Sequence, residues 1–86
     1  MFTKVENQDE ITKQLNQANK SGEEIVIHYS CLDCGDEQVT DFIEIDDKML
    51  SDWLTQQELV VDYSCTTCGV RTLYLNLDNI NGFETR

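Results

Sequence analysis

The chain has 86 residues, of which 40% are hydrophobic, and its 17 acidic and 6 basic residues give a formal net charge of −11. This length fits one small domain, residues 1–86, whose core alone gives limited stability. No apolar run approaches the length of a membrane span. The scarcity of Lys and Arg disfavours direct nucleic-acid binding, because that binding depends on neutralising phosphates.

The first predicted element is a helix from Asn7 to Lys20. Its apolar residues recur at helical spacing and form one narrow stripe, comprising Ile11, Leu15 and Ala18. Asn7 and Glu10 can form a capping pair at the start of the helix, and Gly22 suits the turn at its end. We therefore expect this helix to bury one narrow face.

A hairpin is predicted next. The β-branched run from Ile25 to Tyr29 indicates a strand, and it leads into a Cys-x-x-Cys-Gly turn at residues 31–35. Gly35 permits the positive φ that such a tight turn often needs. The segment Val39–Ile45 is again rich in strand formers, so the turn is expected to lie at the tip of a hairpin.

The second helix is predicted from Asp46 to Gln57, with Asp46 or Asp47 as its N-cap. Ile45 could form a hydrophobic staple with Leu50. The apolar face of this helix is compact and consists of Met49, Leu50, Trp53 and Leu54. Trp53 is interpreted either as a core residue or as an exposed anchor ringed by acidic residues, a composition that suits a protein interface.

The second half of the chain repeats the first. A shift of 34 positions places Leu59–Tyr63 on Ile25–Tyr29 and a second Cys-x-x-Cys-Gly turn, residues 65–69, on the first. Val70–Leu77 follows as another strand, with three leucines on one face, Leu73, Leu75 and Leu77. The order helix, strand, cysteine turn, strand is therefore predicted twice, over residues 7–45 and 46–80.

All four cysteines lie in the two turns, at Cys31, Cys34, Cys65 and Cys68. Two such turns can present four thiolates to one ion in the tetrahedral arrangement of a structural zinc site. Iron uses the same ligands in a tetrathiolate site and stays an alternative. Disulfides are disfavoured because residues 1–11 are charged and contain no apolar leader, which favours a cytoplasmic protein. A redox pair would need a strand-to-helix turn, whereas both turns lie between strands.

The two turns resemble those of zinc-ribbon and rubredoxin-like knuckle proteins, which carry Cys-x-x-Cys-Gly at hairpin tips. The resemblance covers Ile25–Val39 and Leu59–Leu75 and implies that the four cysteines are the ligands and that Gly35 and Gly69 close the turns. These families include nucleic-acid readers, electron carriers and protein-binding modules, so the resemblance constrains the site more than the function.

We therefore predict a single α+β domain of two pseudo-equivalent units. One Zn²⁺ joins the two knuckle-tipped hairpins, and the helices cover part of the strands. The metal would act as the staple that a chain of this size needs. The apolar residues of the tail either close the core or form part of a dimer contact, and they are Leu77, Ile80 and Phe83.

The negative charge is concentrated in residues 23–62, where Lys48 is the single base, while the segments 1–22 and 63–86 are each neutral. Such a segment is either a solvated face that keeps the protein soluble or a surface that steers a basic partner. In the second interpretation the partner-binding residues are Asp41, Glu44, Asp46, Asp47 and Trp53. His28 is expected at a strand position, beside Asp62, and not as a metal ligand, because four cysteines already complete a tetrahedron.

No catalytic set is recognisable, and an ion held by four cysteines has no open position for substrate. We therefore expect a non-enzymatic, cytoplasmic adaptor or inhibitor that docks on a basic protein surface. Its composition is similar to that of phage products that bind host polymerases, nucleoid proteins or AAA+ unfoldases. One alternative is a nucleic-acid-associated or transcription accessory ribbon, which would require a basic strip from Lys4, Lys13, Lys20, Arg71 and Arg86. Another is a rubredoxin-like iron electron carrier.

Overall fold

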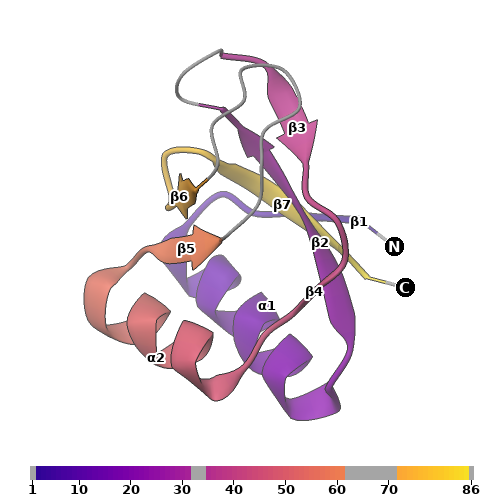
Figure 1. Cartoon of the computed structure of the whole chain (residues 1–86), viewed down its shortest axis with the longest axis vertical. Coiled ribbons are helices and arrows are strands. Elements are labelled where there is room, and N and C mark those ends of the chain that lie inside the picture. The colour runs from indigo at the N-terminus through magenta and orange to yellow at the C-terminus, as the bar shows by residue number, and fades with distance from the viewer. Residues whose placement is uncertain (1, 32–34, 62–71, 86) are drawn as a thin grey trace.

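The computed structural model describes residues 2–31, 35–61 and 72–85, and these form two helices and antiparallel strands (Figure 1). The predicted α+β class is confirmed. The helices are α1 (Gln8–Ser21) and α2 (Asp47–Gln56). The strands are β1 (Phe2–Lys4), β2 (Glu24–Ser30), β3 (Glu37–Val39), β4 (Ile43–Glu44), β5 (Leu59–Val61), β6 (Leu73–Leu75) and β7 (Ile80–Thr85). Neither helix is long and apolar enough to cross a bilayer, within the part of the chain that is described.

Helix α1 has the caps and the buried face that its sequence predicts. The Asn7 side chain accepts a hydrogen bond from the Glu10 backbone N–H at 2.9 Å, and the Glu10 carboxylate accepts one from the Asn7 amide at 3.1 Å. The helix ends where Gly22 takes a left-handed conformation, with φ of 70°. Its buried residues are Ile11, Leu15 and Ala18. The reciprocal cap pairs the polar groups that the first turn would otherwise leave unpaired.

The main sheet has five strands, and β2 and β7 lie at its centre. Strand β7 pairs with β1 on one side and β2 on the other, while β2 pairs on its far side with β3 and then β4 (Figure 1). Neither β1 nor β7 was predicted as a strand, and the apolar tail residues were predicted either to close the core or to form part of a dimer contact. Ile80 and Phe83 are 4% and 1% exposed, so these two close the core.

A β-bulge hides the strand character of β7. Its register against β2 shifts so that His28 is opposite Gly82 but Tyr29 is opposite Ile80, which leaves Asn81 as the extra residue. The extra residue lets Ile80 and Phe83 face the same core although they are three positions apart. This spacing breaks the alternation by which strands are recognised.

The predicted strand Val39–Ile45 is divided into β3 and β4 by a short connection. Thr40 lies in this connection and is 3% exposed. It supplies the hydrogen bonds that a strand residue would otherwise make with Ile27 of β2. The Thr40 hydroxyl accepts from the Ile27 N–H at 2.9 Å, and the Thr40 backbone N–H donates to the Ile27 carbonyl at 3.0 Å. One threonine thus satisfies both backbone groups of a core β2 residue. Sequence reasoning missed this role, because a threonine in a strand-like run carries no distinguishing signal.

Helix α2 packs on α1 through Trp53. This side chain has no exposed surface, and its indole N–H donates to the Thr12 hydroxyl of α1 at 2.7 Å. Met49 and Leu50 are partly buried against the same core. Leu54 is 54% exposed, so its predicted place on the buried face is wrong. At about 100° per residue, Met49, Leu50 and Trp53 form the centre of the buried face, and Leu54 lies at the edge of that face.

The remaining two strands, β5 and β6, form a separate hairpin that lies above the two helices in Figure 1. Leu59, Val61 and Leu75 point into the core, whereas Val60 and Tyr74, which are opposite each other, are exposed. Leu77 is 42% exposed and does not continue the buried leucine face. The strand ends at Leu75, and a turn over residues 77–79 breaks the alternation.

Candidate metal centre and acidic surface

Cys31 occupies the end of β2, in a turn that closes back on itself. Its backbone N–H donates to the Asp36 carbonyl at 2.9 Å, and its carbonyl accepts from the Gly35 N–H at 2.7 Å. Gly35 has a φ of 75°, so the predicted left-handed glycine is confirmed. These bonds hold a turn of the tightness that a Cys-x-x-Cys pair needs in order to direct both sulfurs to one point.

The Cys31 residue itself is 4% exposed and belongs to the main core cluster. The other predicted ligands, Cys34, Cys65 and Cys68, and the second turn glycine, Gly69, lie outside the described residues. The four-cysteine site therefore stays a prediction. Over the described ranges alone, no group of three or more metal-binding side chains is found.

The strands that lead to the two cysteine turns share one core. The cluster that contains Cys31 also contains Val61, the last residue of β5, and Leu75, the last residue of β6. Val61 precedes Cys65 by four positions in the chain.

A turn between β6 and β7 fixes this arrangement with asparagine side chains. Asn79, which is 3% exposed, accepts from the Asn76 N–H at 2.6 Å and donates through its amide to the Tyr74 carbonyl at 2.9 Å. The Asn79 carbonyl in turn accepts from the Ser30 N–H at 2.8 Å, next to Cys31. The turn thus ties the second hairpin to the end of β2. The Asn-x-x-Asn spacing was the available signal, because Asn side chains often bond nearby backbone in turns.

The environment fits a structural metal site better than a reactive thiol. A buried sulfur at a strand end, in a turn closed by backbone hydrogen bonds, is shielded from solvent, whereas reactive cysteines are partly exposed in electropositive surroundings. Two acidic residues, Asp36 and Glu37, follow the Cys31 turn. A divalent cation would be attracted to such a site.

His28 lies on the opposite face of β2 from the core. Its ring meets the Phe2 ring edge-on at 4.7 Å, and its Nε2 is 4.0 Å from a Glu84 carboxylate oxygen. The predicted strand position is confirmed, while the predicted neighbour, Asp62, lies outside the described residues. Cys31 belongs to the core cluster, whereas His28 lies on the other face of β2, and the expectation that His28 is not a ligand stays a prediction.

The predicted acidic surface is exposed, but two of its residues already have structural partners. Asp41, Glu44, Asp46 and Asp47 are all exposed. Asp46 is the N-cap of α2 and accepts from the Met49 N–H at 2.8 Å. The Asp47 carboxylate accepts from the Asn19 amide of α1 at 3.0 Å. These two carboxylates therefore hold α2 in place whether or not a partner binds.

The assignment of Trp53 to the partner-binding set is wrong, and its alternative interpretation as core is confirmed. A fully buried indole whose N–H is already bonded to Thr12 has no surface to offer a partner. Phe42, which lies between Asp41 and strand β4, is one of the exposed apolar residues of the acidic segment and is 43% exposed.

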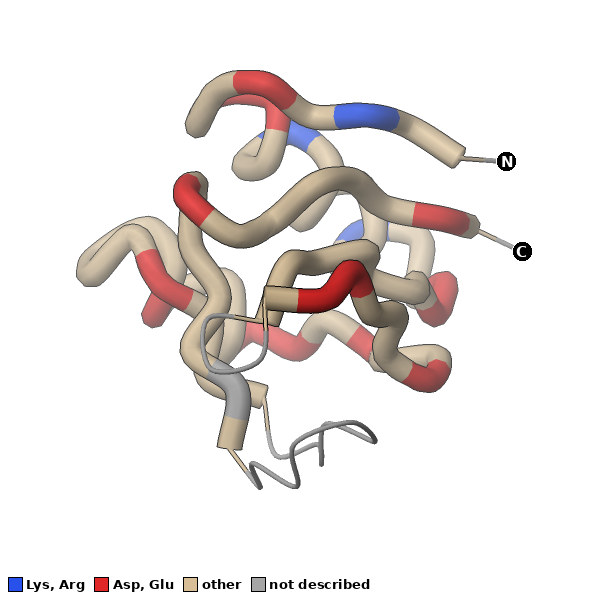
Figure 2. The backbone as a smooth tube through the Cα atoms, turned by 90° about the horizontal axis from the view of Figure 1, so that it is seen from above, with Lys and Arg blue, Asp and Glu red and all other residues tan. Residues whose placement is uncertain are grey.

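Acidic positions far outnumber basic ones along the described backbone, as Figure 2 shows. Lys4 is paired with Glu6 at 3.6 Å, although both side chains are largely exposed and the pair is therefore weak. Of the five bases that a nucleic-acid strip would require, Arg71 and Arg86 lie outside the described residues.

The fold and these surfaces were compared with known proteins in three ways. No protein-family model, no curated protein and no solved structure matches the chain. The functional inference therefore depends on the chain's own residues.

Proposed function

We propose that this protein is a small zinc-stabilised interaction module of the cytoplasm, which acts without catalysis as an adaptor or inhibitor by docking on a basic protein surface. One zinc ion is bound by Cys31, Cys34, Cys65 and Cys68, in the manner of zinc-ribbon and rubredoxin-like knuckle proteins. It joins the two helix–strand–turn–strand units, residues 7–45 and 46–80, into one domain.

The turn at Cys31 is the observation that supports this proposal most strongly. It combines a left-handed Gly35, two backbone hydrogen bonds that close the loop, and a sulfur-bearing residue buried in the core. Val61 and Leu75, which flank the second cysteine turn, belong to the same core cluster. A structural zinc site needs two tight turns that reach one point, and the described geometry provides one turn and the approach to the other.

The net negative charge of the chain supports a basic protein as the partner. A formal charge of −11 repels nucleic acid and attracts a basic protein, and its main concentration lies in exposed positions that include Asp41 and Glu44. Four thiolates on one ion leave no open coordination position, so the metal contributes stability and no chemistry.

The metal is tested by elemental analysis of the purified protein, with a Cys31→Ser variant beside the wild type. We expect one zinc per chain in the wild type and a large loss of bound zinc in the variant, because three thiolates hold the ion less well. Stoichiometric iron and a red oxidised protein would replace this proposal with the electron-carrier alternative. Absence of both metals would refute it.

The partner class is tested by capture from a lysate at increasing salt, with recovered proteins identified by mass spectrometry. We expect basic partners whose capture falls as salt rises, and loss of capture in Asp41→Lys with Glu44→Lys. Asp46 and Asp47 are left unchanged, because reversing them would remove the α2 cap and the bond to Asn19. A matched reversal on the helical side, Asp9→Lys with Glu23→Lys, should retain more capture. Equal capture by all three proteins would contradict the proposed docking surface.

A further inference from the structure

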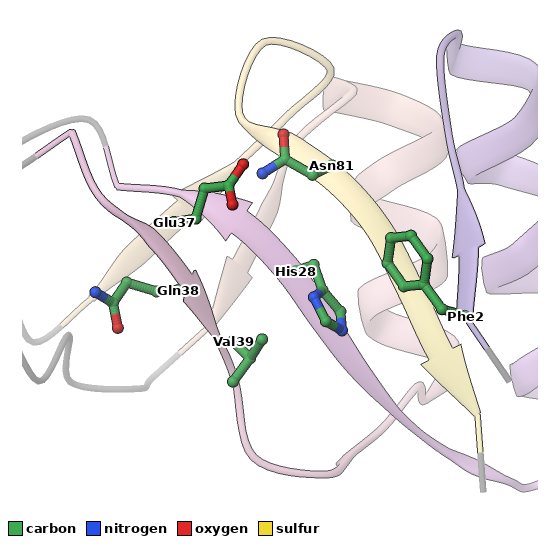
Figure 3. Close-up of a pocket in the computed structure, with 6 residues that line it drawn as sticks. All are labelled: Phe2, His28, Glu37, Gln38, Val39 and Asn81. Atoms are coloured by element: carbon green, nitrogen blue, oxygen red, sulfur yellow. The ribbon is translucent and has the colours of Figure 1, made fainter.

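The face of the five-stranded sheet that points away from the helices is open. Alternation along β2 sends Ile25, Ile27 and Tyr29 into the core with the α1 residues, so His28 and its neighbours face outward. A groove of about 370 Å³ lies on this outer face. It is lined by Phe2, His28, Glu37, Gln38, Val39 and Asn81 (Figure 3).

The apolar part of the groove is built across four strands, β1, β7, β2 and β3. In the register of the sheet, Gly82 lies next to His28, and Val39 lies next to His28 on the other side. A Cβ atom at Gly82 would lie 2.5 Å from Phe2 Cζ and 2.6 Å from the Thr3 carbonyl oxygen. Only glycine leaves room there, so the Phe2 ring lies over Gly82 and against the His28 imidazole. Phe2 and Val39, 49% and 48% exposed, flank the histidine.

Two carboxylates flank this apolar centre along the strand direction. Glu37 is opposite Ser30, two residues after His28, and Glu84 is opposite Val26, two residues before it. In Figure 3 the Glu37 carboxylate extends beside Asn81 at one end of the groove. The two positions are separated by four residues along the strand direction, about 13 Å at a rise of about 3.3 Å per residue, and they lie on opposite sides of β2, about 10 Å apart across the sheet. The pattern along the face is therefore acidic, apolar, acidic.

We propose that this groove binds an extended basic peptide segment of the partner protein, with the pattern basic–x–apolar–x–basic. In an extended chain, side chains two positions apart share a face, and residues i and i+4 are about 13 Å apart, which matches the separation of the two glutamates along the strand direction. The long Lys or Arg side chains span the offset across the sheet. The central apolar side chain packs on Phe2 and Val39. The flanking Lys or Arg side chains lay their stems along the apolar floor and place their charges at Glu37 and Glu84. This inference rests on the proposed function and names the partner's recognised segment.

Charge complementarity selects this occupant. On the outer face, a carboxylate lies on each side of His28 along the strand direction, Glu37 on one side and Glu84 on the other. Lys4, the base on the β1 edge, already pairs with Glu6. An acidic peptide or a nucleic acid would meet these carboxylates without compensation, and a purely apolar segment would leave them desolvated. The aromatic wall at Phe2 adds a cation–π surface for an arginine.

The test measures binding of the intact, metal-loaded protein to a fluorescent peptide with the core Arg-Gly-Leu-Gly-Arg. One control peptide carries citrulline at both arginines, and a second has both arginines next to the leucine. The groove variant is Glu37→Gln with Glu84→Gln. Its charge-matched control is Asp9→Asn with Glu23→Gln, two exposed positions at the ends of α1. Thermal melts establish that the variants remain folded, and Val39→Ser serves as a second groove variant.

We expect the wild type to prefer the spaced peptide and the groove variant to bind it at least about tenfold more weakly, since two charge-assisted contacts are lost. The control variant should bind within about twofold of wild type, because distant exposed charges are screened. Backbone NMR shifts on titration should be centred on His28, Val39 and Gly82.

Three outcomes would overturn the inference. Equal weakening in the two charge variants would indicate diffuse attraction and would leave the proposed function intact. Self-association of the protein through this face in the absence of peptide would identify a second copy as the occupant. No peptide binding, with salt-sensitive partner capture retained, would place recognition elsewhere, whereas loss of both would also refute the proposed function.

Discussion

The two halves of the chain, residues 7–45 and 46–80, give their matching strand sequences different tertiary support. Strand β2 of the first half has seven residues and is paired on both sides, by β7 and by β3 and β4. Strand β5 of the second half has three residues, and within the described residues it pairs with β6. Similar local sequences therefore give a central strand of the main sheet in one case and a short strand of a two-stranded sheet in the other.

Metal removal should produce the largest effect, and it should affect the second half before the first. Structural zinc contributes on the order of 10 kcal/mol or more in small zinc domains, which is comparable to the whole stability of a domain this size. We expect a chelator to abolish hydrogen-exchange protection in β5 and β6 first, while β2 and β7 retain more protection. The measurement is amide exchange by NMR or mass spectrometry, with and without chelator.

The matching control adds zinc in excess of the chelator, which should restore protection. If β2 and β5 lose protection together, the two halves form a single cooperative unit and the difference in strand pairing has no energetic consequence. If neither changes, the proposed metal has no structural role.

Loss of the Trp53 side chain should have the next largest effect, because Trp53 joins the helices of the two halves. Trp53→Ala removes a fully buried indole from the α1–α2 junction, and such truncations cost about 3–5 kcal/mol. The free energy of unfolding in urea measures the loss. Leu54→Ala, one position along the same helix at an exposed site, should change it by well under 1 kcal/mol. Similar losses in the two variants would contradict the core assignment.

The helices and their caps were predictable because their signals are local. Asn7, Glu10, Gly22 and Asp46 act within a few residues of their positions, and all four have the predicted capping roles. The same is true of Gly35, whose left-handed φ follows from a turn motif of five residues.

The sheet was less predictable, since its order depends on contacts distant in sequence. The bulge at Asn81 interrupts the alternation of buried and exposed residues in β7, and β1 has only three residues, so neither strand has a clear sequence signal. The outer-face groove was invisible for the same reason, because Phe2, His28 and Glu37 come together only through pairing of β1, β7, β2 and β3. Sequence alone offered both a core and an interface interpretation of Trp53, and the packing of α2 on α1 decides for the core.

A smaller effect is expected from the hydrogen bond between Trp53 and Thr12, which is one of several bonds between the two halves. Thr12→Val keeps the shape of the side chain but leaves the buried Trp53 N–H without its acceptor, which costs about 1–3 kcal/mol. Thr12→Ser retains the hydroxyl and should recover most of the loss. The midpoint of urea unfolding distinguishes the two variants. Little or no loss in Thr12→Val would contradict a stabilising role for the hydrogen bond, and a loss in Thr12→Ser as large as that in Thr12→Val would mean that the methyl group contributes as much as the bond.

The smallest effect concerns the ends of the two helices, which differ in one residue type. Both C-caps are left-handed, but α1 uses Gly22, with φ of 70°, and α2 uses Gln57, with φ of 57°. A residue with a Cβ pays about 1–2 kcal/mol in this conformation, and glycine avoids the cost while losing more entropy on folding. Gln57→Gly also removes a 3.3 Å bond from the side-chain amide to the Leu54 carbonyl. We therefore expect a net stabilisation of only about 0.5–1 kcal/mol, measured as a higher urea midpoint with an unchanged slope.

The reciprocal change, Gly22→Gln, should destabilise by about 1 kcal/mol, because nothing lies within 4 Å of the added Cβ and backbone strain is the main cost. A destabilising Gln57→Gly would mean that the glutamine side chain contributes more to this helix end than its backbone strain removes.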